Sequence, residues 1–154
     1  MAMDALDRRI IDLLAADGRI PFAQIAGQVG VSTATVHQRV KRLRASNIIK
    51  GFKLELDWKA VGLPVSAIVS IVARSAQPLV EIADDLRKID YVTSCASVTG
   101  EFDLVATVRA ATPDHLGEII DEIRVISDGS TVTALVLTAF FDGEAPTLAV
   151  DPPS

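Results

Sequence analysis

Between residues 65 and 141 the hydrophobic periodicity changes repeatedly, and the order of these changes constrains the fold more than any other feature. Apolar, β-branched runs typical of strands lie at 65–73, 91–98, 101–108 and 130–141. Apolar residues at helical spacing lie between them, at 78–89 and 112–123. The order β-α-β-β-α-β predicts a ferredoxin-like domain, in which both helices cover one face of an antiparallel sheet.

The face of this sheet that turns away from the helices would be polar in a monomer. In the last strand, however, apolar residues occupy both sides: Val132, Ala134, Val136 and Phe140 alternate with Leu135, Leu137, Ala139 and Phe141. The first strand shows the same pattern. We therefore expect a second copy of the chain to cover this face, giving a homodimer. The alternative is that the N-terminal domain covers it.

The first 47 residues predict three short helices. Leu6, Ile10, Leu13 and Leu14 form an apolar stripe that ends near Gly18, a residue suited to a helix C-cap. A second stripe starts at Phe22 and is broken by Gly30. Ser32 can cap a third helix through its hydroxyl. Two short helices around a glycine turn, after a supporting helix, are typical of a helix-turn-helix.

The third helix carries four cations and no acid in the sixteen residues from Ser32 to Asn47. With Val36, Val40 and Leu43 towards the core, we expect Arg39 beside the core face to pack or pair within the domain or to reach the DNA backbone. We expect Gln38 to contact a base and the phosphates to lie towards Lys41. The predicted contacts to double-stranded DNA are Ser32, Thr33, Ala34, Thr35, His37, Gln38, Lys41 and Arg42. The alternative is an ordinary solvated helix with a basic face.

Residues 49–56 alternate apolar and polar side chains, which predicts a strand after the helices, so that the domain is winged-helix-like. Its Lys50 and Lys53 are either phosphate contacts or solvated edge charges. The fold class is thus α+β. We expect a DNA-binding domain at 1–60, a ferredoxin-like oligomerisation domain at 61–142, and a flexible tail at 143–154.

Composition narrows the class of protein further. Residues 1–60 hold ten Lys/Arg and six Asp/Glu, whereas residues 61–154 hold five and fourteen, either by chance or because one end meets a polyanion. We expect no signal peptide and no membrane span, and hence a cytoplasmic protein. One cysteine and two distant histidines predict no metal site, and we expect no cofactor and no catalysis.

The chain resembles the Lrp/AsnC, or feast/famine, transcriptional regulators over residues 6–142. The resemblance rests on four segments in order: LDRRIIDLLAADGRI, IAGQVGVSTATVHQRVKRL, IIKGFKLELD and the hairpin Gly100-Glu101-Phe102-Asp103. It implies a regulator that binds DNA as a dimer, often within an octamer of four dimers, and that senses a small molecule, typically an amino acid, through the domain at 61–142. Asn47 stands where many relatives have glycine, and because asparagine tolerates positive φ we expect the turn to persist.

The resemblance implies an effector pocket between dimers, near the hairpin and the start of the last strand. The implied residues are Thr99, Gly100, Glu101, Asp103, Thr131 and Thr133. Many relatives have two threonines two residues apart in the last strand, but Leu135 follows Thr133 here, so a hydroxyl contact is missing. A ligand-independent or architectural DNA-binding protein therefore stays an alternative, and an enzyme similar to sirohaem decarboxylases is a more distant one.

Asp103 has a second interpretation in the sequence. Gly100-Glu101 fits a two-residue hairpin loop, with glycine where positive φ is needed, between strands at 91–99 and 102–109. Asp103 would then face the open side of the sheet together with Val105 and Thr107. A carboxylate there needs a partner. Three partners stay open: a cation of a neighbouring chain, backbone N–H groups, or the ammonium of a ligand.

Overall fold

The computed structural model describes residues 3–143 and 146–148, and its contacts divide the chain into two units. One unit consists of the residues up to Leu54 together with those from Phe141 onward, and the other is Glu55–Phe140. Most of the tail that we expected to be flexible, 143–154, lies outside the described residues. Within the described part, no helix is long and apolar enough to cross a membrane.

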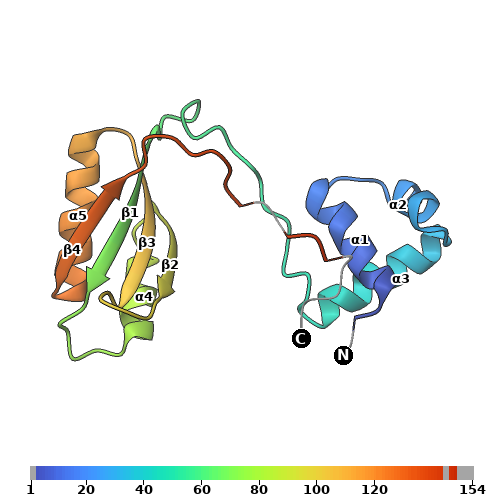
Figure 1. Ribbon diagram of the computed structural model, residues 1–154, viewed down its shortest axis with the longest axis horizontal. Coiled ribbons are helices and arrows are strands. Elements are labelled where there is room, and N and C mark those ends of the chain that lie inside the picture. The colour runs from blue at the N-terminus through green and yellow to red at the C-terminus, as the bar shows by residue number, and fades with distance from the viewer. Residues whose placement is uncertain (1–2, 144–145, 149–154) are drawn as a thin grey trace. The chain divides into compact units, whose positions relative to one another are not determined.

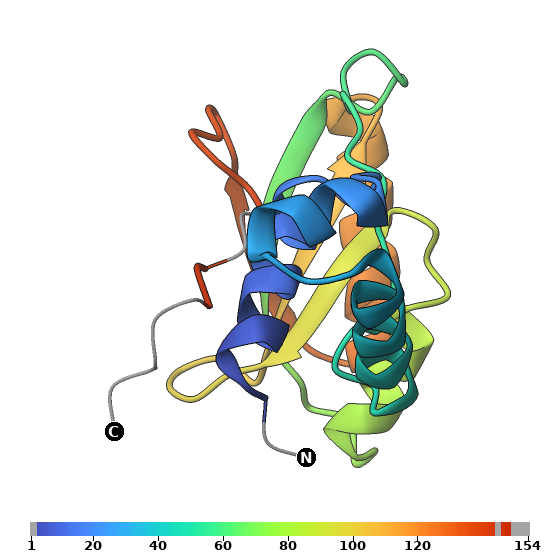
Figure 2. The same ribbon diagram turned by 90° about the vertical axis from the view of Figure 1, so that its right-hand side faces the viewer.

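The first unit contains the three expected helices, α1 (Ala5–Ala16), α2 (Phe22–Val29) and α3 (Thr33–Ala45), coloured blue to teal in Figures 1 and 2. Gly30 ends α2 with a φ of 73°, and the hydroxyl of Ser32 accepts the N–H of Thr35 at 3.1 Å to cap α3. The apolar stripes meet in one core, which includes Ile10, Leu14, Ile25, Val36 and Val40. Asn47 follows α3 with a φ of 59°, as expected.

Two expectations for this unit are wrong. Residues 49–56 form no strand, because a strand needs a neighbour for its hydrogen bonds and none of the described strands pairs with this segment. Gly18 is not the cap of α1, since Asp17 takes that position in an extended conformation. A Cβ on Gly18 would lie 3.0 Å from Cδ1 of Phe52, so this glycine leaves space for an aromatic ring of the irregular segment.

The second unit has the predicted ferredoxin-like order of elements. It consists of β1 (Val65–Val72), α4 (Leu79–Leu86), β2 (Val92–Ser97), β3 (Leu104–Ala110), α5 (Pro113–Ser127) and β4 (Ser130–Leu135). The sheet order is β2-β3-β1-β4, and every neighbouring pair is antiparallel. The last strand ends at Leu135 rather than at residue 141.

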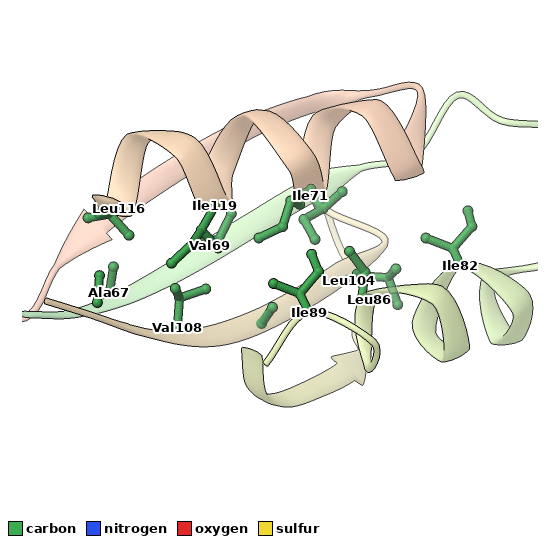
Figure 3. Packing of buried hydrophobic residues seen from close by; sticks show 13 residues of the cluster. Ala67, Val69, Ile71, Ile82, Leu86, Ile89, Leu104, Val108, Leu116 and Ile119 are labelled. Carbon is green, nitrogen blue, oxygen red and sulfur yellow. The ribbon is translucent and has the colours of Figure 1, made fainter. Parts of the chain in front are cut away.

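One face of the sheet is closed by the two helices. Figure 3 shows Leu116 and Ile119 of α5 above Ala67 and Val69 of β1, and the buried cluster continues to Ile82 of α4. Along each strand, the residues that face the helices alternate with residues that face the open side, as the period of two in a strand requires. Burial of this apolar face is the main stabilising contribution to the unit.

The other face is open and carries no charge in its middle. Two rows run across the four strands in register, Ala96–Val105–Ser70–Val132 and Ser94–Thr107–Ile68–Ala134. Val132 is 59% exposed and Ile68 is 42% exposed. Serine and threonine interleave with the apolar residues, so this face is more mixed than the sequence suggested. Charges lie only at its two ends, at Asp103 and at Arg109, whose guanidinium lies 5.2 Å from the ring centre of Trp58.

Candidate functional site

Helix α3 exposes the side that the sequence assigned to DNA. Val36, Val40 and Leu43 are buried in the core, while Gln38 and Lys41 are exposed. Of the other candidates, Ser32, Thr33, Ala34, His37 and Arg42 are exposed and Thr35 is half-buried. The helix therefore presents a polar and cationic ridge that can enter a major groove, with the backbone N–H groups of its first turn at one end.

A hollow lies next to this ridge, between α2 and α3. It has a volume of about 330 Å³ and is lined by Phe22, His37, Val40, Lys41 and Arg44. The rings of Phe22 and His37 meet edge to face with centroids 5.8 Å apart. This contact holds His37 beside α2. The lining of the hollow also brings Arg44, which is not among the predicted DNA contacts, next to Lys41.

Two arginines of α3 are held by α1. Arg39 donates to Asp4 and, at 3.1 Å, to Asp7, which confirms the pairing within the domain. Nη2 of Arg42 donates to both carboxylate oxygens of Asp7, at 2.9 and 2.7 Å. The hydrogen bond from Arg39, followed by that from the backbone N–H of Asp7, lowers the pKa of Asp4 below its ordinary value of 3.8.

Asp7 is the residue of this site that sequence reasoning missed. Its side chain is fully buried, although aspartate is almost never buried without a partner. A signal was present, because Asp7, Ile10 and Leu14 share one face of α1 at i, i+3 and i+7. An acid within an apolar stripe indicates a cation on the helix that packs against it. Asp4 and Asp7 also form a capping box at the start of α1.

The hairpin between β2 and β3 is longer than a two-residue turn. Residues 98–103 separate the strands, although the N–H of Val98 still donates to the carbonyl of Asp103 at 3.1 Å. Gly100 has a φ of 118°, as the turn requires, and Thr99 and Glu101 are exposed. Asp103 is half-buried, and its Oδ2 accepts the N–H of Ala73 at 2.9 Å, just after β1. Of the three partners left open, a backbone N–H of the same chain is the one found here.

The two threonines of β4 lie on the opposite face from Asp103. Thr131 pairs with Ile71 and Thr133 with Val69, so both face the helix side of the sheet at its edge. There Nε of Arg124 in α5 donates to Oγ1 of Thr131 at 2.9 Å. Ile71 also pairs with Leu104, so Thr131 and the hairpin share one end of the sheet. A single chain thus brings Thr131 and the hairpin residues to one end of the sheet, with Thr133 two residues farther along β4, but not to one surface.

Comparison with known proteins agrees with both units. Residues 3–44 match the AsnC-type helix-turn-helix domain, and residues 66–146, more than half of the chain, match the Lrp/AsnC ligand binding domain. The chain belongs to the Lrp/AsnC family. It is a DNA-binding transcriptional regulator with a ligand-binding domain, and not an enzyme.

Relatives within the Lrp/AsnC family match almost the full length. The chain is 32% identical to the HTH-type transcriptional regulator LrpA of Mycobacterium tuberculosis, over 91% of this chain and 93% of that protein. It is 31% identical to the regulatory protein AsnC of Escherichia coli, over 88% and 90%. A solved feast or famine regulatory protein of M. tuberculosis, complexed with L-methionine, superposes with a TM-score of 0.90 at 32% identity and covers 95% of this chain and 99% of that one.

Proposed function

We propose that this Lrp/AsnC regulator is a cytoplasmic homodimer that reads double-stranded DNA with the exposed ridge of α3 and changes its DNA affinity or assembly when an amino acid binds. Residues 1–60 would bind DNA, and residues 61–142 would bind the effector and the second copy. The observation that carries the DNA part is the separation on α3 between the buried Val36, Val40 and Leu43 and the exposed Gln38 and Lys41.

The open face of the sheet supports the proposed dimer. Its two uncharged rows offer apolar side chains and hydroxyl groups to an identical surface, and an isologous contact would cover both copies at once. Two recognition helices related by a two-fold axis would then read two half-sites. An octamer of four dimers would extend this arrangement, and the effector would act by favouring or opposing its formation.

The effector is proposed to be an amino acid at the hairpin end of the sheet. The support is the relative complexed with L-methionine and the position of Thr131 and of the hairpin residues Thr99, Gly100, Glu101 and Asp103 at that end, with Thr133 two residues farther along β4. Since these residues lie on two faces of one sheet, a second chain is needed to complete the pocket. The effector would act by a population shift, because it binds one assembly better than another.

One observation favours a regulator that ignores small molecules. The Asp103 carboxylate already accepts an N–H of its own chain, so a ligand ammonium is not needed to satisfy it. Thermal melting of the full chain with each amino acid, L-methionine first, separates the two functions. A ligand of the native state at 100 times its dissociation constant stabilises by about 2.7 kcal/mol. No shift with any amino acid would favour the ligand-independent regulator.

The DNA part is tested on the chain's own upstream DNA. We expect Gln38→Ala combined with Lys41→Ala to weaken binding and to reduce the slope of log affinity against log salt by about one per subunit, because one phosphate contact is lost. Fluorescence anisotropy at several salt concentrations measures both quantities. An unchanged affinity and an unchanged slope would show that α3 is not the reading helix.

A further inference from the structure

The Arg42 guanidinium is only partly used by its contact with α1. Nη2 binds both oxygens of Asp7, whereas Nε and Nη1 donate to no atom of the described part of the chain. The side chain remains 45% exposed. Arg42 follows Gln38 by four residues and Thr35 by seven, so it lies on the same ridge of α3. A guanidinium held by one nitrogen at this place can still offer two others to an anion.

We propose that Asp7 is a positioning residue for DNA binding, which holds Arg42 by Nη2 so that its remaining N–H groups face a phosphate of the DNA backbone. The proposal rests on α3 as the reading helix. A free arginine loses much rotamer freedom when it binds a phosphate, and the planar fork loses less when it is already held. The pairing would lower that loss before DNA arrives.

The burial of Asp7 makes it suitable for this role. Because the carboxylate is fully buried between α1 and α3, it does not face the phosphates, while its partner reaches the surface. Arg39 has a different environment: it is only 25% exposed and binds both Asp4 and Asp7. Arg39 therefore holds α3 against α1, and Arg42 links the buried Asp7 to the exposed ridge of α3.

A purely structural role for Asp7 gives a different result in a double-mutant cycle. If Asp7 only fixes α1 against α3, its replacement weakens DNA binding whether or not Arg42 is present. If Asp7 acts through Arg42, its replacement has no further effect once Arg42 is gone. The coupling between the two substitutions, measured in DNA affinity, is therefore the quantity that decides.

The experiment compares the full chain, Asp7→Asn, Arg42→Ala and the double variant on one duplex of upstream DNA at several salt concentrations. We expect Arg42→Ala to weaken binding about tenfold and to reduce the salt slope by about one per subunit. Asp7→Asn alone should weaken binding about threefold to tenfold, and the double variant should bind like Arg42→Ala. Equal effects of Asp7→Asn with and without Arg42, or an unchanged slope in Arg42→Ala, would overturn the proposal.

Asp4→Asn provides the matched control. It removes a carboxylate from Arg39 but not from Arg42, and asparagine remains a good N-cap for α1. We expect its DNA affinity to stay within about twofold of the full chain. A loss equal to that of Asp7→Asn would assign the effect to the anchoring of the helices and overturn the proposal. Circular dichroism and thermal melting of each variant confirm that it is folded at the temperature of the binding experiment.

The same series separates this proposal from the function on which it rests. If Gln38→Ala with Lys41→Ala has no effect, the assignment of α3 to DNA fails, and the role of Asp7 fails with it. If that variant loses affinity while Asp7 and Arg42 show no coupling, only the role of Asp7 is overturned.

Discussion

The two units of this regulator close their cores in opposite ways. The helix-turn-helix unit surrounds its core with three helices and buries a charged residue, Asp7, that two arginines neutralise. The ferredoxin-like unit covers one face of its sheet with apolar contacts and leaves the other face open. The first unit is thus held together by a few directional pairs, whereas the second leaves a surface on which the proposed dimer would form.

The largest expected effect on stability comes from a charge on the helix side of β1, and the same charge on the open side provides the comparison. Val69→Asp would put an unpaired carboxylate under α5 and should cost about 4 kcal/mol or more, enough to unfold the second unit. Ile68→Asp, one residue earlier, should leave the unit folded and weaken the dimer by about 100-fold. Sedimentation gives the dimer constant, and the fluorescence of Trp58, the only tryptophan, reports folding of this unit.

The comparison between the two faces would fail in either of two cases. A folded Val69→Asp variant would show that the helix side is not the closed side. An Ile68→Asp variant that remains dimeric would show that the open face is not the contact between copies. In the second case the homodimer would need another surface.

Asp103 tests whether the second unit uses a directional pair as the first one does. Asp103→Ala should lower the stability of this unit by about 1 kcal/mol, because the N–H of Ala73 loses its acceptor. Asp103→Asn keeps an acceptor and should have less than half of that effect. Urea unfolding followed by Trp58 fluorescence measures both.

A ligand contact predicts the opposite order of effects. If Asp103 served only an effector, Asp103→Ala would leave the stability of the effector-free protein unchanged and would remove the response to amino acids. Melting of both variants with and without L-methionine therefore distinguishes a structural acid from a ligand-binding acid. Asp103→Asn separates the two further, because it keeps the hydrogen bond but removes the charge that an ammonium would need.

Local sequence patterns predicted most of the fold, and the errors occur where the structure of a segment depends on residues that are distant in the sequence. The three N-terminal helices and the order of the sheet follow from periodicity, caps and glycines. Residues 49–56 have the alternation of a strand, but no described strand pairs with them, so the pattern alone was misleading. In the same way, the hydrogen bond of Asp103 joins residues 30 positions apart, which no local pattern reveals.

The candidate site shows the same limit at the level of side chains. The exposed side of α3 was predictable, because three apolar residues at helical spacing fix which side faces the core. The sequence predicts a phosphate contact for Arg42 but does not reveal that Asp7 binds it, because that partner depends on how α1 crosses α3. The available signal was Asp7, an acid in the apolar stripe of α1. It indicates that a buried ion pair exists, but it does not identify the arginine that forms it.

The smallest expected effect is the response of the first unit to acid. The pKa of Asp4 is lowered by its hydrogen bond to Arg39, so this pair stabilises the folded state above the unfolded pKa, near 3.8, and the contribution is lost as pH falls through the lower folded value. Asp4→Asn should therefore make the stability of α1 and α3 depend less on pH below about 4. Amide exchange of the two helices at several pH values measures this dependence. A slope equal to that of the unmodified chain would show that Asp4 and Arg39 do not interact in solution, and the directional pairs of the first unit would then reduce to those of Asp7.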